Sequence, residues 1–442
     1  MGFDITESKL YSIIKLIVNV LIILFGFYIS FYIRYGQNIQ DRNIEPFFAL
    51  MPYIALISLF FFYIYLADNN GDDSYIDKII SSGLAIAMIQ ICTMALTFFA
   101  RGFAFPRSIF AISFLIHIAA MSMWKRVVIS FEYRYGGQNR LLLVGDDEKN
   151  RRTAGNILKM KNSRIKVVGD MAASEFLGKM SFEDIDSICI TGSVESVPKE
   201  EILESAVSQN KNIYILPDLY EIILSNSKLG QFDDMPVFKA RRLSLSMEQR
   251  FMKRMLDLAL VIPGLIIAAP FMFVAVLMIK KDDGGPIFFK QERLTVEGRK
   301  FELVKFRTMV VDAEAKTGPV LAGMDDPRIT NSGKLLRATR LDELPQLFNV
   351  LKGELSLVGP RPERKFFYDE FEKAVPRFKY RLSVKGGVTG LGQILGKYTT
   401  SPDDKLAYDL LYAYNYSILL DIKIILQTIR IMMKKSSSDG SI

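Results

Sequence analysis

The stretch MLDLALVIPGLIIAAPFMFVAVLMI, Met255–Ile279, decides how this chain is built. It is apolar throughout except for Asp257, and its length exceeds the ~20 residues that cross a bilayer core. Pro263 and Pro270 lie in its middle, where each removes a backbone donor and favours a kink. The segment is therefore predicted to enter a membrane as a proline-broken helix.

Positive charge flanks this segment on both sides. Lys253-Arg254 precede it and Lys280-Lys281 follow it. Because Lys and Arg near a membrane segment favour the cytoplasmic face, both ends are expected on the same side. The pattern favours a re-entrant hairpin over about residues 253–281, and an ordinary crossing with a proline kink is the alternative.

The first third of the chain contains further apolar segments of membrane-spanning length. They are Leu16–Ile33, Phe47–Leu66, Ile79–Ala100 and Ile109–Ile129. These predict a four-helix transmembrane region, residues 1–136, with both ends on one side. The basic residues Lys125, Arg126 and Arg134 favour the cytoplasm for that side, although the loop Asp68–Lys78 on the same side is acidic.

Composition limits the chemistry that the chain can perform. The 442 residues carry 56 Lys and Arg against 48 Asp and Glu, which suits phosphorylated substrates or anionic lipids. The chain has 2 cysteines and 1 histidine, His117, which lies inside an apolar run and is expected to be a packed membrane residue. Catalysis by a Ser-His or Cys-His pair is therefore excluded, and nothing indicates a nucleic-acid partner.

Residues 137–238 alternate short apolar runs with polar helical stretches. The runs are Arg140–Gly145, Arg164–Val168, Ser187–Thr191 and Asn212–Leu216, and the stretches lie near Asp147–Lys161 and Pro198–Ser208. This alternation predicts a Rossmann-like α/β module with a parallel sheet. Gly145 is followed by two aspartates rather than a glycine-rich fingerprint, and their charge would repel a pyrophosphate. A scaffold or oligomerisation module is favoured over a nucleotide site.

The remaining residues, 239–442, are predicted to form a mainly α catalytic domain. Phe232–Ser246 is expected to be a connector and Ser436–Ile442 a disordered tail. Asp342-Glu343 are adjacent carboxylates before an apolar run, and Pro345 is tolerated only in the first turn of a helix. A helix is therefore predicted to begin near Leu341 or Asp342 and to end at Gly353. One carboxylate could then attack a phosphate while the other holds a metal, with simple helix capping as the alternative.

Basic clusters surround this carboxylate pair in the sequence. Lys305 and Arg307 alternate with apolar residues and would share one face of a strand. Arg361 lies between two prolines, and such rigidity favours phosphate binding. Gln291 and Arg293 follow a strand-like run. The combination predicts chemistry on phosphates, with a hard divalent cation at the carboxylate pair.

From about Lys253 to Lys434 the chain resembles the bacterial sugar transferase family, the polyprenyl-phosphate hexose-1-phosphate transferases. The motifs that carry the resemblance are Lys253-Arg254-x-x-Asp257, Gln291-x-Arg293, Lys305-Phe306-Arg307-Thr308-Met309, Asp342-Glu343-Leu344-Pro345-Gln346-Leu347, Leu351-Lys352-Gly353-Glu354, Gly359-Pro360-Arg361-Pro362, Val388-Thr389-Gly390 and Tyr412-x-x-Asn415-Tyr416-Ser417 with Asp421. The four apolar segments and the α/β module match the long monotopic form of this family.

The resemblance implies an enzyme of the bacterial inner membrane whose catalytic domain faces the cytoplasm. Such an enzyme transfers a sugar-1-phosphate from a UDP-sugar to undecaprenyl phosphate, releases UMP and starts an O-antigen, capsule or exopolysaccharide. By resemblance Asp342 is the nucleophile, Glu343 binds magnesium, and Pro270 breaks the re-entrant helix. The phosphate pocket would be lined by Lys305, Arg307, Arg340 and Arg361.

The chain departs from the family pattern at Thr295, Lys385-Gly386-Gly387 and Leu391, which concerns the sugar or nucleotide site rather than the phosphoryl chemistry. Two other hypotheses remain: a membrane nucleotide-sugar dehydratase or epimerase using the α/β module, and a membrane scaffold with a degenerate transferase domain. A homodimer is expected only from the presence of the extra module. The sequence does not identify the sugar.

Overall fold

The computed structural model describes residues 9–36, 39–66, 75–99, 105–135, 137–145, 147–158, 165–177, 184–191, 199–311, 313, 326–396 and 400–433. Two compact units divide the chain, Met1–Leu216 and Pro217–Ile442. The expected tail Ser436–Ile442 lies outside the described residues. The domain bounds drawn from the sequence at residues 136 and 238 stay predictions.

The first unit begins with the helices that the apolar segments predicted. They are α1 (Lys9–Tyr35), α2 (Asp41–Leu66), α3 (Tyr75–Phe99) and α4 (Arg107–Tyr135). Within the described part of the chain, five helices are long and apolar enough to cross a membrane, these four and α9 of the second unit. Their inner faces pack large side chains, such as Phe27, Phe31 and Phe62, which are fully buried.

His117 is a packed residue of this bundle, as predicted. Its ring nitrogen Nε2 lies 2.9 Å from the carbonyl oxygen of Ile23, and Nδ1 lies 3.2 Å from the amide Nε2 of Gln90. Because a carbonyl oxygen only accepts, the ring donates from Nε2 and accepts at Nδ1, which is the neutral form. Gly26 makes room for the ring, since a Cβ there would lie 2.3 Å from it. Both ring nitrogens are thus satisfied by neighbouring helices.

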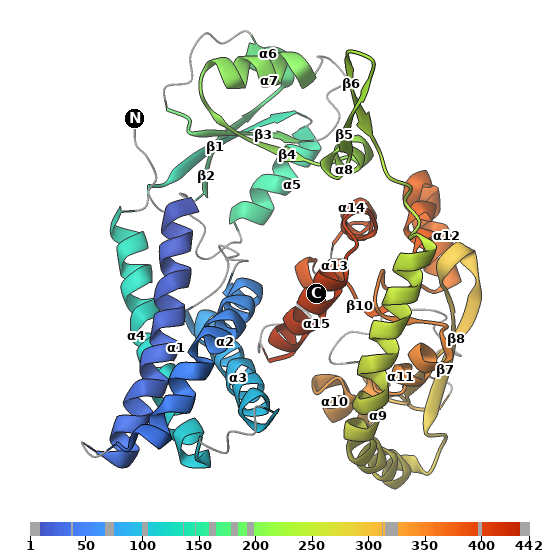
Figure 1. Cartoon of the computed structure of the whole chain (residues 1–442). Coiled ribbons are helices and arrows are strands. Elements are labelled where there is room, and N and C mark those ends of the chain that lie inside the picture. Colours follow the sequence, from blue (N-terminus) through green and yellow to red (C-terminus); the bar gives the residue numbers. More distant parts are fainter. Residues whose placement is uncertain are drawn as a thin grey trace. The chain divides into compact units, whose positions relative to one another are not determined.

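The α/β module of the first unit contains a parallel sheet with the order β2-β1-β3-β4 (Figure 1). Its elements are β1 (Asn139–Gly145), α5 (Asp147–Leu158), β2 (Ile165–Met171), α6 (Ala173–Leu177), β3 (Ser187–Thr191), α7 (Lys199–Ser208) and β4 (Asn212–Leu216). The central strands β1 and β3 are buried on both faces, which is why their sequences read as continuous apolar runs. The predicted parallel sheet is confirmed, and the short helix α6 was not predicted.

The second unit opens with α8 (Leu219–Ser225), followed by β5 (Lys228–Phe232) and β6 (Met235–Lys239). The two strands pair as an antiparallel hairpin, so the predicted connector Phe232–Ser246 includes the strand β6, which the sequence did not indicate. The positive φ of 55° at Asp233 lets the chain reverse between the strands. A turn of only two residues left no polar stretch long enough to reveal the hairpin in the sequence.

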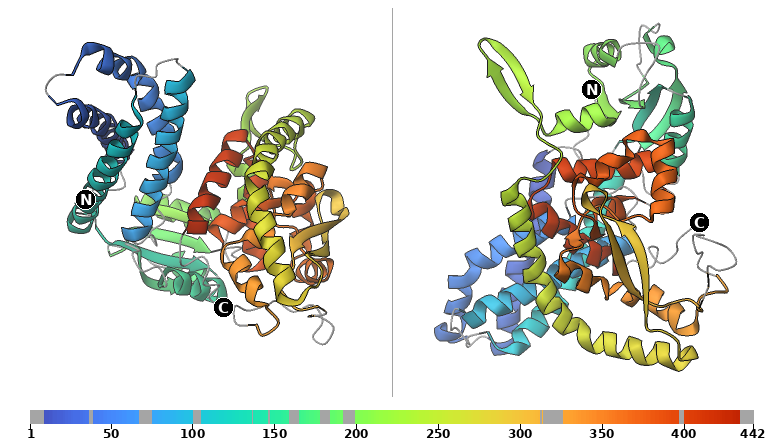
Figure 2. Two further views of the ribbon diagram at one scale, coloured as in Figure 1. Left: turned by 90° about the horizontal axis from the view of Figure 1, so that it is seen from below. Right: turned by 90° about the vertical axis from the view of Figure 1, so that its right-hand side faces the viewer.

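The proline-containing segment forms one helix, α9 (Met247–Asp283), with Pro263 and Pro270 inside it. A capping box between Ser246 and Gln249 starts the helix, and Gly284 ends it in the left-handed conformation. Figure 2 (right) shows α9 bent, its green-yellow first part and its yellow last part running in different directions. Bending of this kind is what proline within a helix produces.

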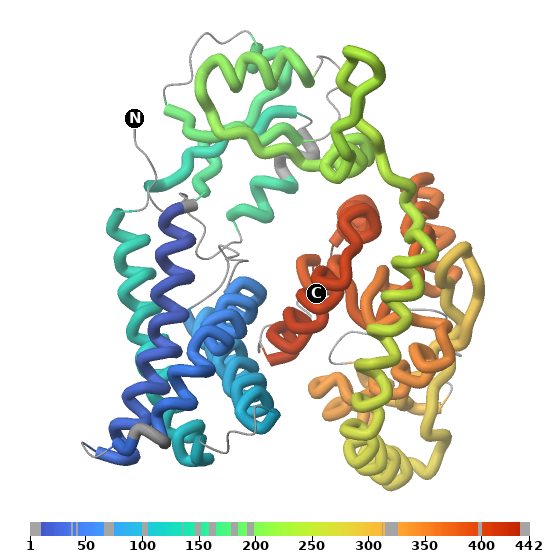
Figure 3. Tube along the Cα trace, viewed as in Figure 1, coloured from blue at the N-terminus to red at the C-terminus, as the bar shows by residue number. Residues whose placement is uncertain are grey.

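Hairpins and short helices complete the second unit. They are β7 (Phe288–Leu294), η2 (Val296–Gly298), β8 (Lys300–Phe306), α10 (Asn331–Ala338), η3 (Leu341–Glu343), α11 (Gln346–Lys352), β9 (Ser356–Val358), α12 (Lys365–Ala374), η4 (Pro376–Ser383), β10 (Gly387–Thr389), α13 (Leu391–Leu395), α14 (Pro402–Tyr414) and α15 (Ile418–Met433). β7 and β8 pair antiparallel, and β9 and β10 pair parallel. Figure 3 traces this path to the red helices α14 and α15. The domain is mainly α, as predicted.

Both parts of α9 pack on this same unit. Val261 and Leu265 contact a core that includes Leu303, whereas Ala275 and Ile279 contact a second core around Leu336. The helix therefore makes apolar contacts with the rest of this unit both before and after its prolines.

Candidate active site

The adjacent carboxylates lie on a short 3₁₀ turn, η3, between α10 and α11. Arg340 precedes them in the left-handed conformation, with φ 55°, which turns the chain sharply after α10. The predicted helix start at Leu341 or Asp342 is therefore wrong, because α11 begins only at Gln346, after Pro345. The predicted end at Gly353 is confirmed by its φ of 85°.

Glu343 is the meeting point of two predicted phosphate-binding residues. Lys305 Nζ donates to Glu343 Oε1 over 2.7 Å, and Arg361 Nη2 lies 3.7 Å from the same oxygen. Burial alone would raise the pKa of Glu343, but the charges of Lys305 and Arg361 outweigh it and lower the pKa to about 2. Glu343 is thus a carboxylate that stays ionised throughout the physiological range.

Asp342 has a different environment although it is the next residue. Burial and the neighbouring charge of Glu343 raise the pKa of Asp342 to about 6, while Lys305 and Arg337 oppose the shift. Two adjacent carboxyl groups with opposite pKa shifts are typical of sites where each group has its own task.

Arg337 belongs to this cluster and was not identified from the sequence. Its Nε donates to Thr308 Oγ1 over 2.9 Å, and its charge acts on Asp342. It lies on α10, outside the basic motifs named from the sequence. Without the fold, the sequence does not show that this face of α10 is turned towards Asp342. Arg340, which was predicted, is exposed and its charge helps to lower the pKa of Glu343.

Arg307 lies apart from the carboxylate pair. Its guanidinium forms a bidentate ion pair with Asp283 at the end of α9, with Nη1 donating to Asp283 Oδ2 over 2.6 Å. Nε also donates to the Pro286 carbonyl oxygen over 2.7 Å. The side chain is 6% exposed, so Arg307 here fastens α9 to the end of β8. Its predicted role in phosphate binding stays a prediction.

Gln291 and Arg293 are brought to the loop that carries Arg361. Arg293 Nη2 donates to Gln291 Oε1 over 2.6 Å, and Nη1 donates to the Pro362 carbonyl oxygen over 3.2 Å. Both side chains therefore support this loop rather than line the carboxylate pair. A direct contact of either residue with substrate stays a prediction.

Close backbone packing fixes the position of the loop before Arg361. The Gly359 N–H donates to the Thr389 carbonyl oxygen over 2.8 Å. A Cβ on Gly359 would lie 2.3 Å from the Lys385 carbonyl oxygen, and one on Gly387 would lie 2.1 Å from the Gly359 nitrogen. Only glycine allows this approach, so the glycines of these motifs are explained by the loop geometry.

Pro270 lies on a part of α9 whose surroundings are largely exposed and apolar. Ile266 and Ile267 are 71% and 68% exposed, and Phe273 is 64% exposed. Large apolar side chains at such exposure are costly in water and suit a lipid environment. This surface agrees with a membrane-embedded bend at Pro270.

A magnesium ion fits the chemistry of the carboxylate pair. Among the described residues, no three His, Cys, Asp or Glu side chains gather as a metal cluster. Mg²⁺ commonly takes one or two carboxylates and completes its ligands with water and substrate phosphates. Asp342 and Glu343 provide that donor set, and the ion itself stays a prediction.

Comparison with known proteins agrees with this geometry. Residues 248–435 match the model of the family described as bacterial sugar transferase. An N-acetylgalactosaminephosphotransferase of Aeromonas hydrophila, which acts on undecaprenyl phosphate, is 38% identical over 186 residues, 41% of this chain and 44% of the relative. The UDP-glucose:undecaprenyl-phosphate glucose-1-phosphate transferase of Xanthomonas campestris pv. campestris is 35% identical over 234 residues, 51% of this chain and 48% of the relative.

A shorter relative is covered more fully. A Bacillus subtilis protein, provisionally named an undecaprenyl-phosphate N-acetylgalactosaminyl 1-phosphate transferase, is 47% identical over 130 residues, 29% of this chain and 72% of the relative. The chain spans under half the length of the two longer relatives. The family match does not include the α/β module, so it lends no support to a dehydratase or epimerase activity there.

Proposed function

Because the chain belongs to the bacterial sugar transferase family, we propose that it transfers a sugar-1-phosphate from a UDP-sugar to undecaprenyl phosphate. The observation that carries this proposal is the pair of carboxyl groups with opposite pKa shifts, Asp342 and Glu343, next to the cations Lys305 and Arg361. The product would be the lipid-linked first sugar of a surface glycan.

The reaction takes place in two displacements on phosphorus. A carboxylate oxygen of Asp342 attacks the phosphorus nearer the sugar, a new O–P bond forms, and the bond to the UMP oxygen breaks. UMP leaves with the bonding electrons. A phosphate oxygen of undecaprenyl phosphate then attacks the same phosphorus and releases Asp342, giving a sugar diphosphate on the lipid. One pocket serves both phosphate substrates in turn.

The basic residues neutralise the charge that develops on the transferring phosphoryl group. Lys305 and Arg361 lie close to Glu343, and the charges of Lys305 and Arg337 act on Asp342. The pKa of Asp342 is raised to about 6. A cation bound nearby would lower this pKa and so favour the ionised form that acts as the nucleophile. Magnesium held by Glu343 and substrate phosphates would supply that charge.

We further infer that α9 is re-entrant rather than a crossing. Near its first end, Arg254 Nη1 donates to the Val350 carbonyl oxygen over 2.6 Å, and at its last end Asp282 accepts from the Ser332 N–H over 2.9 Å. A straight helix of 37 residues would be about 55 Å long, so its ends would lie on opposite sides of a bilayer. Attachment of both ends to one folded unit supports entry and exit on the same side, which is the cytoplasmic side of the bacterial inner membrane.

Activity is tested with membranes that contain the overproduced chain, undecaprenyl phosphate, Mg²⁺ and one UDP-sugar at a time. UDP-glucose, UDP-galactose and UDP-N-acetylgalactosamine come first, because relatives are named for these sugars. UMP release that depends on the lipid phosphate is the expected result. The proposal fails if no UDP-sugar, including N-acetylated and deoxy forms, gives UMP above the level of membranes that lack the overproduced chain.

Topology is tested separately by labelling single cysteines in intact and permeabilised spheroplasts. The native Cys92 and Cys189 are changed to Ser, and Glu248→Cys or Lys281→Cys, both at exposed positions, is introduced. A re-entrant helix makes both positions react only after permeabilisation. Labelling of one position in intact spheroplasts would mean that α9 crosses the membrane.

A further inference from the structure

The loop that carries Arg361 is held by hydrogen bonds to its backbone. Carbonyl oxygens of three successive residues each accept a bond from outside the loop. These bonds are Arg381 Nη2 to Arg361 O at 2.8 Å, Arg293 Nη1 to Pro362 O at 3.2 Å and Leu294 N to Glu363 O at 3.2 Å. A loop held at three consecutive carbonyls has little freedom to move.

Arg381 is the most enclosed of these donors. It lies on η4, is 4% exposed, and its Nε is 2.9 Å from Asp409 Oδ2. Its Nη1 lies 3.7 Å from Glu363 Oε1, and its guanidinium carbon lies 4.6 Å from the centroid of the Phe378 ring. The planar guanidinium thus faces two carboxylates, an aromatic ring and the Arg361 carbonyl at once, a set of contacts that lysine cannot reproduce.

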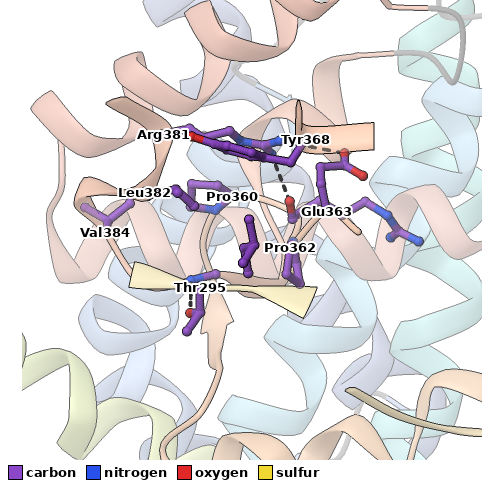
Figure 4. A pocket seen from close by; sticks show the side chains of 11 residues that line it. Thr295, Pro360, Pro362, Glu363, Tyr368, Arg381, Leu382 and Val384 are labelled. Carbon is purple, nitrogen blue, oxygen red and sulfur yellow. Dashed lines mark hydrogen bonds and ion pairs between the residues drawn. The ribbon is translucent and has the colours of Figure 1, made fainter. Parts of the chain in front are cut away.

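Exposure separates the tasks of the two arginines. The Arg361 side chain is 45% exposed and approaches Glu343, whereas the Arg381 side chain is 4% exposed. Figure 4 shows Arg381 with Pro360, Pro362 and Glu363 around a cavity that Arg361 also lines. Arg381 touches the backbone of Arg361 and is too enclosed to meet a substrate phosphate itself.

We propose that Arg381 is a positioning residue for the phosphoryl transfer, fixing the Arg361 backbone so that the Arg361 guanidinium stands at Glu343. This rests on the proposed function, because it assigns Arg361 to the phosphate pocket. A displacement of about 1 Å at a phosphate-binding group can cost roughly a hundredfold in rate. The buried Asp409 and the partly exposed Glu363 serve the same purpose by holding Arg381 in one orientation.

The test is a double-mutant cycle with Arg381→Lys and Arg361→Ala, measured as kcat/KM for the UDP-sugar. Arg381→Lys keeps the charge but loses the fork of donors, and is expected to lower kcat/KM about tenfold to a hundredfold. In the Arg361→Ala background the same change is expected to cost about twofold or less, because the group that it positions is gone. Equal costs in both backgrounds would overturn the proposal.

A second cycle and a control separate positioning from folding. Arg293→Lys weakens the hold on the next carbonyl of the same loop, and its effect is expected to shrink likewise in the Arg361→Ala background. If Arg381→Lys does not fold, the cycle of Arg293→Lys with Arg361→Ala is the test. An effect of Arg293→Lys that is equally large with and without Arg361→Ala counts against the proposal. Arg377→Met, at an exposed position of the same 3₁₀ helix, is expected to leave kcat/KM unchanged.

Different results would contradict the proposed function and the positioning role of Arg381. If the wild-type chain releases no UMP with any UDP-sugar, the proposed function is wrong. If the wild type is active and the effects of Arg381→Lys and Arg361→Ala simply add, only the positioning role is wrong.

Discussion

Two of the charged clusters in the described part of the second unit differ in how far they are exposed to solvent. The anchor cluster comprises Lys253, Tyr412 and Asp421, in which Lys253 Nζ donates to Tyr412 Oη over 2.8 Å and to Asp421 Oδ2 over 2.6 Å. Tyr412 Oη donates to Asp421 Oδ1 over 2.8 Å, which closes the triangle. The side chains of Lys253 and Asp421 are 5% and 1% exposed.

The carboxylate cluster comprises Lys305, Asp342, Glu343 and Arg361, and it is open. Lys305 and Glu343 are 20% and 19% exposed, and Arg361 is 45% exposed. In the anchor cluster the charges of Lys253 and Asp421 pair with each other and both side chains are buried. In the carboxylate cluster Asp342, the proposed nucleophile, has a pKa raised to about 6 although the charge of Lys305 opposes the shift. Partial exposure therefore distinguishes the carboxylate cluster, which a ligand can reach, from the buried anchor cluster.

The sharpest test of this distinction is Asp342→Asn. The amide keeps the shape of the side chain but cannot attack phosphorus, so UMP release is expected to fall by about 10⁴-fold or more, roughly 5 kcal/mol of barrier. The thermal unfolding midpoint is expected to stay unchanged or rise slightly, because a partly buried charge is removed.

The matched control for Asp342→Asn is Asp369→Asn, which changes a carboxylate that is 45% exposed on α12. Activity of this control should equal that of the wild type. A labelled phosphosugar adduct should be trapped on the wild-type chain and map to Asp342. An Asn variant that keeps its rate would show that the open cluster does not contain the nucleophile.

Lys253→Met is the corresponding change in the anchor cluster. It leaves Asp421 buried without its cation, and removing one partner of a buried ion pair costs about 3–5 kcal/mol of unfolding free energy. Because burial already raises the pKa of Asp421, the lone carboxyl is expected to protonate on loss of the cation. Unfolding in detergent, followed by circular dichroism, measures the loss.

The double variant Lys253→Met/Asp421→Asn should regain much of the stability that Lys253→Met loses, because no charge is left unpaired. The folded fraction of either variant should retain its specific activity within about threefold. Loss of activity without loss of stability would contradict the structural role of the anchor cluster.

Glu343→Gln is expected to have the next largest effect. The amide removes the charge that pairs with Lys305 and would hold magnesium, and activity at saturating Mg²⁺ is expected to fall about a hundredfold, near 3 kcal/mol. The Mg²⁺ concentration for half-maximal activity should rise in the same variant. Glu302→Gln, at the 66% exposed Glu302, is the control. An unchanged Mg²⁺ requirement in Glu343→Gln would show that Glu343 does not bind magnesium and only positions Lys305 and Arg361.

The sequence predicted the regular parts of this molecule well, for a physical reason. Strand runs such as Ser187–Thr191 are buried on both faces, and the bundle helices are apolar over membrane length, so local pattern and burial coincide. The hairpin β5–β6 was not predicted because its strands are short and mostly exposed, so the sequence lacks the alternation of buried and exposed residues that indicates a strand.

The sequence predicted which residues gather at the site, but not which pairs they form. Lys305, Glu343 and Arg361 converge as their basic and acidic character suggested. Arg307, two residues after Lys305, pairs instead with Asp283 because β8 ends between them and the chain turns towards α9. Such pairings depend on which elements meet across the fold, and neither spacing nor charge within one segment reveals them.

Lys290→Ala should have the smallest effect, and it sets the scale for the others. Lys290 Nζ lies 3.0 Å from Glu302 Oε2 across the β7–β8 hairpin, with both side chains more than half exposed at 62% and 66%. The distance resembles those of the anchor cluster, but water screens this pair and the side chains lose entropy on pairing. The expected change in unfolding free energy is therefore below about 0.5 kcal/mol, with unchanged UMP release. A loss of unfolding free energy comparable to that of Lys253→Met would show that exposure does not determine how much an ion pair stabilises this fold. The contrast between the carboxylate cluster and the anchor cluster would then have no physical basis.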